Sequence, residues 1–271
     1  MKRYKPTSNG LRQREILSHE KSKKPLKSLL KPLKKTAGRN NTGRITVRHR
    51  GGGSRRHYRC VDLKRLGSTA GKLGKIVQFE YDPVRTARLA LIVYETGFKA
   101  YILAPAKSKV GDTIMAGDMA DIKPGHALTL KRIPTGTIVH NVGLTIGGAG
   151  KLVRAGGAGA TVVSKFENYA SLKLPSGEIR KVHVNCTATV GQVGNADNRN
   201  QKIGKAGAKR WRGIRPTVRG AAMNATDHPH GGRQGKAPVG AASPRSKWGK
   251  PVFKKTRRAK PSSRLIVKRR K

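Results

Sequence analysis

The positive charge of this sequence, and its uneven distribution, limits the fold more than any other feature. The 271 residues include 60 Lys and Arg against 13 Asp and Glu, a formal net charge of +47. Residues 1–50 hold 16 cations and two acids, residues 51–200 hold 22 and ten, and residues 201–271 hold 22 and one. Blocks of one sign repel themselves and bury too little apolar surface to fold alone. We therefore expect a folded middle, two extended basic ends and a polyanionic partner.

A membrane fits this sequence less well than a nucleic acid. Membrane surfaces usually call for a basic amphipathic helix, and a span needs about 18 apolar residues in a row; we find neither pattern. The basic N-terminus is not followed by the apolar run of a secretory signal. Cys60 and Cys186 lie among apolar residues without the close pairing of a metal site, so we interpret both as small buried hydrophobes.

The middle of the chain has the pattern of short β-strands. Runs rich in Val, Ile and Tyr are separated by Gly, Pro, Asp and Asn, at a spacing of about 8–12 residues. We expect one short helix over Lys205–Trp211 and a domain boundary near Lys123-Pro124-Gly125. This pattern predicts a mostly β protein with two small barrels. The expected strands are Arg44–His49, His57–Asp62, Gly74–Tyr81, Arg88–Tyr94, Lys99–Leu103, Ala127–Leu130, Thr137–Val142, Ala160–Phe166, Ala170–Leu174, Arg180–Val184 and Thr187–Val193.

The segment Gly38–Arg59 combines closely spaced arginines with three consecutive glycines. Forked guanidinium donors match phosphate geometry, and glycine lets backbone N–H groups come close to a phosphate. If Arg44–His49 is a strand, Arg44 and Arg48 share one face. A solvated basic loop is the alternative. The predicted RNA contacts here are Arg39, Arg44, Arg48, His49, Arg50, Arg55 and Arg56.

Two further basic segments follow the middle of the chain. In Gly204–Arg219, Trp211 stands between two arginines, where its ring either stacks on a base or packs inward and anchors the tail. The tail from Lys247 to Lys271 is basic and low in complexity; phosphate neutralisation explains it better than a nuclear localisation patch. The predicted contacts are Lys205, Arg210, Trp211, Arg212, Arg215 and Arg219.

The loop Gly220–Lys236 contains two histidines on either side of a proline, Asp227-His228-Pro229-His230. Zinc would need more ligands than this cluster provides. A general base oriented by Asp227 is the catalytic alternative, but no recognisable Ser or Cys nucleophile accompanies it. We interpret the segment as a stiff loop whose histidines donate to RNA phosphate or 2′-OH groups. The predicted contacts are Asn224, His228, His230 and Arg233.

Several long blocks resemble the large-subunit ribosomal protein family called L-two, in its bacterial or organellar form. The most specific is Pro216-x-x-Arg219-Gly220-Ala221-Ala222-x-Asn224-Ala225-x-Asp227, followed directly by His228-Pro229-His230-Gly231-Gly232. The blocks GRNNTGRITVRHRGGG, EYDP, YILAP and GKAGAKRWRG also resemble the family. The resemblance implies a basic N-terminal extension at 1–37, an oligonucleotide-binding-type barrel at 38–124, an SH3-like barrel at 125–196 and an extended basic RNA-binding segment at 197–271.

The resemblance also implies a function. The implied protein is a structural constituent of the ribosome and not an enzyme. It binds large-subunit rRNA and supports subunit assembly, subunit association, tRNA binding and the geometry of the peptidyl transferase centre. The implied partners are rRNA, neighbouring ribosomal proteins and the small subunit, in a cytoplasmic or organellar ribosome. No cofactor is implied, apart from structural Mg²⁺ held through RNA. His228 stands where a family histidine supports the peptidyl transferase centre.

Two other classes of function remain as alternatives. One is an enzyme acting on nucleic acid through Asp227, His228 and His230. The other is a DNA-compacting protein, although such proteins usually carry helices or minor-groove wedges that this sequence does not show.

Overall fold

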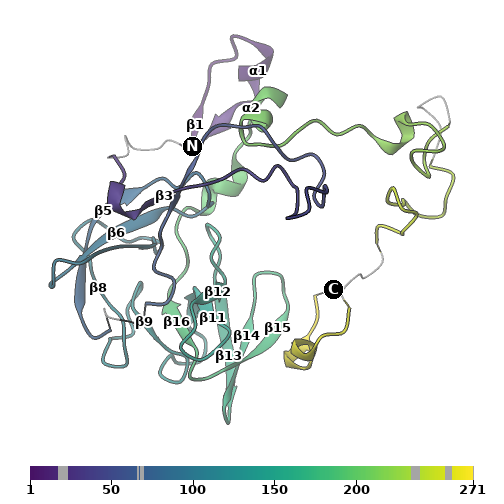
Figure 1. The fold of residues 1–271 in the computed structure, drawn as a ribbon. Helices are drawn as coiled ribbons and strands as arrows, with labels where there is room; N and C mark the ends of the chain where they lie inside the picture. Colours follow the sequence, from purple (N-terminus) through teal and green to yellow (C-terminus); the bar gives the residue numbers. More distant parts are fainter. Residues whose placement is uncertain (18–23, 66, 68–69, 233–238, 254–257, 271) are drawn as a thin grey trace. The chain divides into compact units, whose positions relative to one another are not determined.

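The fold is built mainly from short β-strands, as the sequence predicts (Figure 1). The computed structural model describes residues 1–17, 24–65, 67, 70–232, 239–253 and 258–270. These residues form two compact units. The sheet unit comprises Met1–Lys34, Arg55–Lys205 and Ser262–Lys271, and the two-segment unit comprises Lys35–Ser54 and Ala206–Pro261. Among the described helices, none is long and apolar enough to cross a membrane.

A four-stranded antiparallel sheet in the sheet unit has the order β7-β6-β5-β8. Strand β6 is rich in Leu, Ile and Val and is buried on both faces, because one core cluster forms around Ile92 and another around Leu89 and Tyr101, whereas β5 leaves Leu73 and Val77 exposed. A bulge between Ile76 and Gln78 bends β5. The strands are β5 (Leu73–Glu80), β6 (Leu89–Tyr94), β7 (Lys99–Leu103) and β8 (Thr113–Met115).

A seven-stranded antiparallel sheet in the same unit has the order β17-β15-β14-β13-β10-β16-β9. Its core contains Val139, Leu172 and Cys186, each at most 1 % exposed. Cys186 is therefore the small buried hydrophobe that the sequence predicts, whereas Cys60 is only half-buried; both thiols are free. The strands are β9 (Ala127–Thr129), β10 (Ile138–His140), β13 (Ala160–Phe166), β14 (Tyr169–Lys173), β15 (Ile179–His183), β16 (Thr187–Val190) and β17 (Ile266–Lys268).

Three two-stranded ribbons and six short helical segments complete the described elements. The ribbons are β1 (Lys2–Arg3) with β2 (Glu15–Ile16), β3 (Leu30–Pro32) with β4 (His57–Arg59), and β11 (Val142–Gly143) with β12 (Gly150–Leu152). The α-helices are α1 (Asn9–Arg12) and α2 (Ala206–Trp211), and the 3₁₀ helices are η1 (Lys27–Leu29), η2 (Ala196–Asn200), η3 (Gly220–Ala222) and η4 (Pro261–Leu265).

A buried charge network stabilises the four-stranded sheet. Tyr101, on β7, places its hydroxyl 2.8 and 2.9 Å from the two carboxylate oxygens of Glu80, and the same hydroxyl accepts the backbone N–H of Leu26 at 2.9 Å. Arg59 lies 3.9 Å from Glu80 and 3.9 Å from Asp82. Because all four charged or polar side chains are buried, each needs these partners to offset its desolvation.

The predicted strand Arg44–His49 is wrong. The segment alternates polar and apolar residues, but its apolar side chains do not pack against a core: Ile45 is 58 % exposed and Val47 is 52 % exposed. The backbone N–H groups of Thr46 and Val47 both donate to the carbonyl of Gly38, which closes a loop rather than a ladder. His49 adopts a positive φ of 59°, which ends the extended run.

The other predicted strands coincide with or overlap observed ones, and α2 confirms the predicted helix. Six observed strands were not predicted from the sequence: β1, β2, β3, β8, β12 and β17. These elements are only two or three residues long. Several of them lie in basic segments without apolar alternation, so they carry too little pattern to be recognised.

Candidate nucleic-acid interface

The two-segment unit joins Lys35–Ser54 to Ala206–Pro261, two stretches of the chain separated by the whole of the middle. Backbone hydrogen bonds link them directly. The N–H of Gly51 donates to the carbonyl of Gly213 at 3.1 Å, and the N–H of Ser54 donates to the carbonyl of Trp211 at 2.9 Å. The two segments predicted to carry the most specific RNA contacts are therefore parts of one structure.

A second link extends this pairing. The N–H of Arg215 donates to the carbonyl of His49 at 3.0 Å, and Arg50 forms an antiparallel bridge with Ile214. The side chains of Arg50 and Arg215 are exposed. The pairing thus fixes the backbone at two arginines while leaving their guanidinium groups in solvent.

Two of the three glycines in the triple-glycine stretch are used within the protein. A Cβ on Gly53 would lie 2.7 Å from the nitrogen of Gly213 and 2.8 Å from the carbonyl oxygen of Trp211. A side chain at this position would therefore separate the two segments. Gly52, by contrast, has open space around its Cβ position. The N–H of Gly51 is used within the protein, so it is not available to a phosphate.

Almost all charged residues of the two-segment unit are cations. By sequence it holds five Lys or Arg in residues 35–54 and fifteen in residues 206–261, against one acid, Asp227. With one acid against twenty cations, the two-segment unit concentrates positive potential.

The structure places the predicted contact residues in three groups. Most belong to the two-segment unit and are exposed, three are half-buried histidines of that unit, and three belong to the sheet unit. The exposed group is Arg39, Arg44, Arg48, Arg50, Arg210, Trp211, Arg212, Arg215, Arg219 and Asn224; the histidines are His49, His228 and His230; the sheet unit contains Arg55, Arg56 and Lys205. Arg233 lies outside the described residues.

The two histidines of the loop form a contact pair with defined hydrogen bonds. Their ring centroids are 4.7 Å apart. His228 Nδ1 accepts the backbone N–H of His230 at 3.1 Å, and His230 Nε2 accepts the backbone N–H of Arg245 at 2.8 Å. A nitrogen that accepts carries no proton, so the neutral His228 ring keeps its N–H at Nε2. That N–H is the only hydrogen-bond donor of the neutral ring.

The environment of His228 favours its neutral form. Withdrawal from water lowers the pKa of His228, and unfavourable electrostatic interactions with His230, Arg48 and Lys247 lower it further. The ring packs against Gly220, where any Cβ would overlap the imidazole. Position 220 therefore sets where the ring lies.

The described residues of this loop form neither a metal-binding group nor a carboxylate–histidine dyad. The described residues contain no group of three His, Cys, Asp or Glu side chains placed to hold a metal ion. Within the described chain, the carboxylate of Asp227 makes no hydrogen bond to either imidazole, and the histidine nitrogens that face the protein accept backbone N–H groups. A general base would need its second nitrogen held by a carboxylate or a similar group.

Sequence reasoning missed one residue of this unit. The guanidinium of Arg48 lies 5.2 Å from the ring centroid of Trp248, whose side chain is 70 % exposed. This pair joins the tail to the first segment through a cation–π contact. The available signal was a tryptophan inside a basic, Ser- and Pro-containing stretch, which we interpreted only as part of a uniform basic tail.

Comparison with known families agrees with these features. The model for "Ribosomal Proteins L2, RNA binding N-terminal domain" matches residues 26–116, and the model for "Ribosomal Proteins L2, C-terminal domain" matches residues 123–249. The two matches together span most of the chain, in the family order, and confirm the resemblance carried by its motifs. The chain therefore belongs to the ribosomal protein L2 family and is a structural ribosomal protein that binds rRNA.

Proposed function

We propose that the two-segment unit is the part of this protein that holds large-subunit rRNA in a fixed geometry. The observation that carries the proposal is the backbone pairing between Gly51–Ser54 and Trp211–Gly213, which fixes a set of exposed cations in a unit with one acid. Guanidinium groups on a fixed backbone bind phosphates with less loss of side-chain and chain entropy than they would on a free tail. The charge supplies affinity, and the pairing determines which phosphates are contacted.

The finer roles follow from holding RNA rigidly. By this proposal the protein supports assembly of the large subunit, association with the small subunit, tRNA binding and the geometry of the peptidyl transferase centre. Neighbouring ribosomal proteins and the small subunit would be its other partners, in a cytoplasmic ribosome or an organellar one. Any Mg²⁺ would be structural and bound through RNA. The Nε2–H of His228 would donate to RNA as a support for its geometry and would not transfer protons.

Salt dependence of binding tests where the phosphates are contacted. The logarithm of the binding constant falls with the logarithm of salt concentration, by about 0.7–0.9 for each phosphate neutralised. Replacing the four exposed arginines of the first segment by glutamine should reduce this slope by about 3. The control replaces four exposed cations of the sheet unit, with the same change in net charge. The test set is Arg39, Arg44, Arg48 and Arg50, and the control set is Lys109, Arg132, Lys151 and Lys173.

The measurement is equilibrium binding of the full chain to large-subunit rRNA between about 50 and 200 mM salt. A slope reduced only by the test set supports the proposal. Equal reductions of the salt slope by both sets would show that all exposed cations contribute alike to RNA binding. The two-segment unit would then not be the preferred RNA-binding part of the protein.

The catalytic alternative makes a different prediction for His228. If Asp227, His228 and His230 formed an active site, His228→Ala would lower turnover of a free nucleic-acid substrate by a factor of about 10² or more. By our proposal the purified protein shows no turnover to lose, and the defect of His228→Ala appears only in assembled subunits. Turnover by the wild-type protein that disappears in the variant would overturn the structural role.

A further inference from the structure

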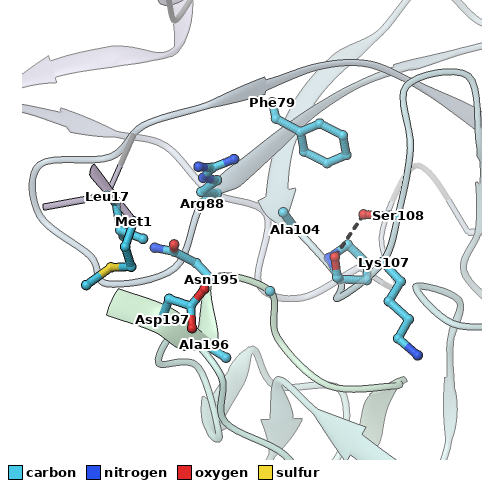
Figure 2. A pocket seen from close by; sticks show the side chains of 12 residues that line it. Met1, Leu17, Phe79, Arg88, Ala104, Lys107, Ser108, Asn195, Ala196 and Asp197 are labelled. Carbon is cyan, nitrogen blue, oxygen red and sulfur yellow. Dashed lines mark hydrogen bonds between the residues drawn. The ribbon is translucent and has the colours of Figure 1, made fainter. Parts of the chain in front are cut away.

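A cavity of about 380 Å³ opens in the sheet unit, away from the residues discussed above (Figure 2). Figure 2 shows the ring of Phe79 on one side of it, the guanidinium of Arg88 nearby, and Asn195 and Asp197 on the other side. Its volume is at the low end of the range of about 300–1,000 Å³ usual for small-ligand sites. An object of the size of one nucleotide fits, and a folded peptide or a helix does not.

The walls of the cavity are fixed by hydrogen bonds within the protein. The N–H of Gly194 donates to the carbonyl of Ala104 at 2.9 Å, and the N–H of Ala104 donates to the carbonyl of Arg88 at 3.0 Å. The side-chain amide of Asn195 donates to the carbonyl of Thr86 at 2.6 Å. The loop that carries Asn195 is therefore tied to the edge of the four-stranded sheet. A ligand would meet a site that is already formed.

The chemistry of the lining points to a base and not to a phosphate alone. Asp197 is exposed and, among the described residues, its carboxylate has no ion pair or hydrogen-bond partner. A carboxylate repels phosphate, so it is an unfavourable residue to leave open in an RNA-binding protein of charge +47. A carboxylate attracts cations and accepts from N–H donors, and in RNA the base edges supply such donors.

Among the four RNA bases, guanine fits a carboxylate best. Its Watson–Crick edge presents two adjacent N–H donors, which both oxygens of one carboxylate can accept at once. Cytosine and adenine present one amino group each beside a ring nitrogen that accepts and would face the second oxygen. Phe79 adds a ring face on which a base can stack, and Arg88 adds a positive charge to the lining.

We propose that this cavity receives a single unpaired guanine nucleotide of RNA, with its Watson–Crick edge on Asp197 and its ring beside Phe79. The proposal rests on the RNA-binding function described above and adds a sequence-specific contact to it. Binding would take one nucleotide out of the stack while the rest of the RNA stays paired, so the preferred target is a one-nucleotide bulge.

Four RNA hairpins that differ only in one bulged nucleotide, together with a fully paired hairpin, test the proposal with the full chain. We expect the guanine bulge to bind about 5- to 100-fold more tightly than the adenine, cytosine and uracil bulges, which is the range for a bidentate base contact. The variant Asp197→Asn should remove this preference, because an amide cannot accept two N–H groups from guanine.

The control variant Glu95→Gln makes the same change in net charge at another exposed carboxylate without a partner among the described residues. It should raise the affinity for all hairpins slightly and leave the preference for guanine intact. A second variant, Phe79→Leu, should weaken binding of every bulged hairpin relative to the paired one, with circular dichroism used to confirm that it folds.

Two results would overturn the proposal: equal affinities for the four bulges, or a guanine preference that persists in Asp197→Asn. In either case, salt-sensitive binding to the paired hairpin would show that RNA binding itself is intact. Loss of that salt-sensitive binding would instead contradict the function on which the proposal rests.

Discussion

The backbone N–H of Ser54 donates a 2.9 Å hydrogen bond to the carbonyl oxygen of Trp211. This bond joins the first basic segment of the protein to the end of α2. It depends on the neighbouring glycine, because only a residue without a side chain lets the two backbones come this close. The two segments of this unit are therefore paired through main-chain atoms, and most of the unit's arginine side chains are exposed.

Gly53→Ala should open this pairing. The added Cβ would lie 2.7 Å from the nitrogen of Gly213, on a backbone with φ of +79°. Gly52→Ala is the matched control, since its φ of +64° carries a similar strain while nothing lies within 4 Å of the new atom. We expect amide exchange at Ser54 and Gly51 to accelerate, and rRNA affinity to fall, in the first variant only. Equal effects in both variants would mean that backbone strain at positive φ, and not the clash of the new Cβ with Gly213, causes the change.

Acid should destabilise the protein through His140. This residue is 1 % exposed, its Nδ1 lies 2.8 Å from the carbonyl of Gly191, and burial lowers the pKa of His140 to about 4. The unfolded chain, with a pKa of about 6.5 at this residue, binds a proton that the folded chain does not. The free energy of unfolding therefore falls as pH decreases from about 6.5 to 4, by about 3 kcal/mol in all.

Denaturant unfolding at a series of pH values measures this loss. The variant His140→Gln should flatten the slope between pH 4 and 6.5, whereas His57→Gln, at an exposed histidine, should leave it unchanged. If both variants keep the full slope, another group is responsible for the acid sensitivity.

Tyr101→Phe should destabilise the four-stranded sheet by about 1–3 kcal/mol, because it leaves the buried carboxylate of Glu80 without its closest hydroxyl donor. Burial raises the pKa of Tyr101 to about 12, so the hydroxyl stays protonated at neutral pH. Tyr169→Phe is the control: Tyr169 is 40 % exposed and its hydroxyl has no hydrogen bond among the described residues. The midpoint of urea unfolding should shift for the first variant and hardly at all for the second.

Gly220→Ala should displace the imidazole of His228, against which position 220 packs. Once the ring moves into water, the pKa of His228 should rise toward its ordinary value, because withdrawal from water is the main cause of its lowering. Titration of the ring protons by NMR measures this change. Gly207→Ala, where nothing lies near the new Cβ, should leave the titration curve as it is in the wild type.

Part of this architecture could be predicted from the sequence because it depends on side-chain pattern. β7 (Lys99–Leu103) and β13 (Ala160–Phe166) have the predicted bounds, since apolar residues in short runs bounded by turns identify strands directly. The sequence also predicts arginines and histidines as RNA contacts, because phosphate binding favours those residue types. The structure groups most of them in the two-segment unit, and their contact with RNA stays a prediction.

Other parts could not be predicted, for two physical reasons. The pairing of Gly51 with Gly213 uses only backbone atoms. Because every residue has these atoms, no residue type in the sequence indicates the pairing. The segment Arg44–His49 has the alternation of a strand without a core to bury its apolar face, and alternation alone does not show whether a core is present. The cavity beside Asp197 draws on residues from distant loops, which only the fold brings together.

The pairing of the two segments can form only late in synthesis of the chain. During synthesis the first segment, ending at Ser54, emerges long before its partners Trp211 and Gly213 exist. Its arginines then form only a flexible polycation, able to bind any RNA nearby. A chain that stops before residue 211 has neither of these partners for the segment. A fixed arrangement of these cations is therefore available only to a chain that extends past residue 213, and not to shorter N-terminal fragments.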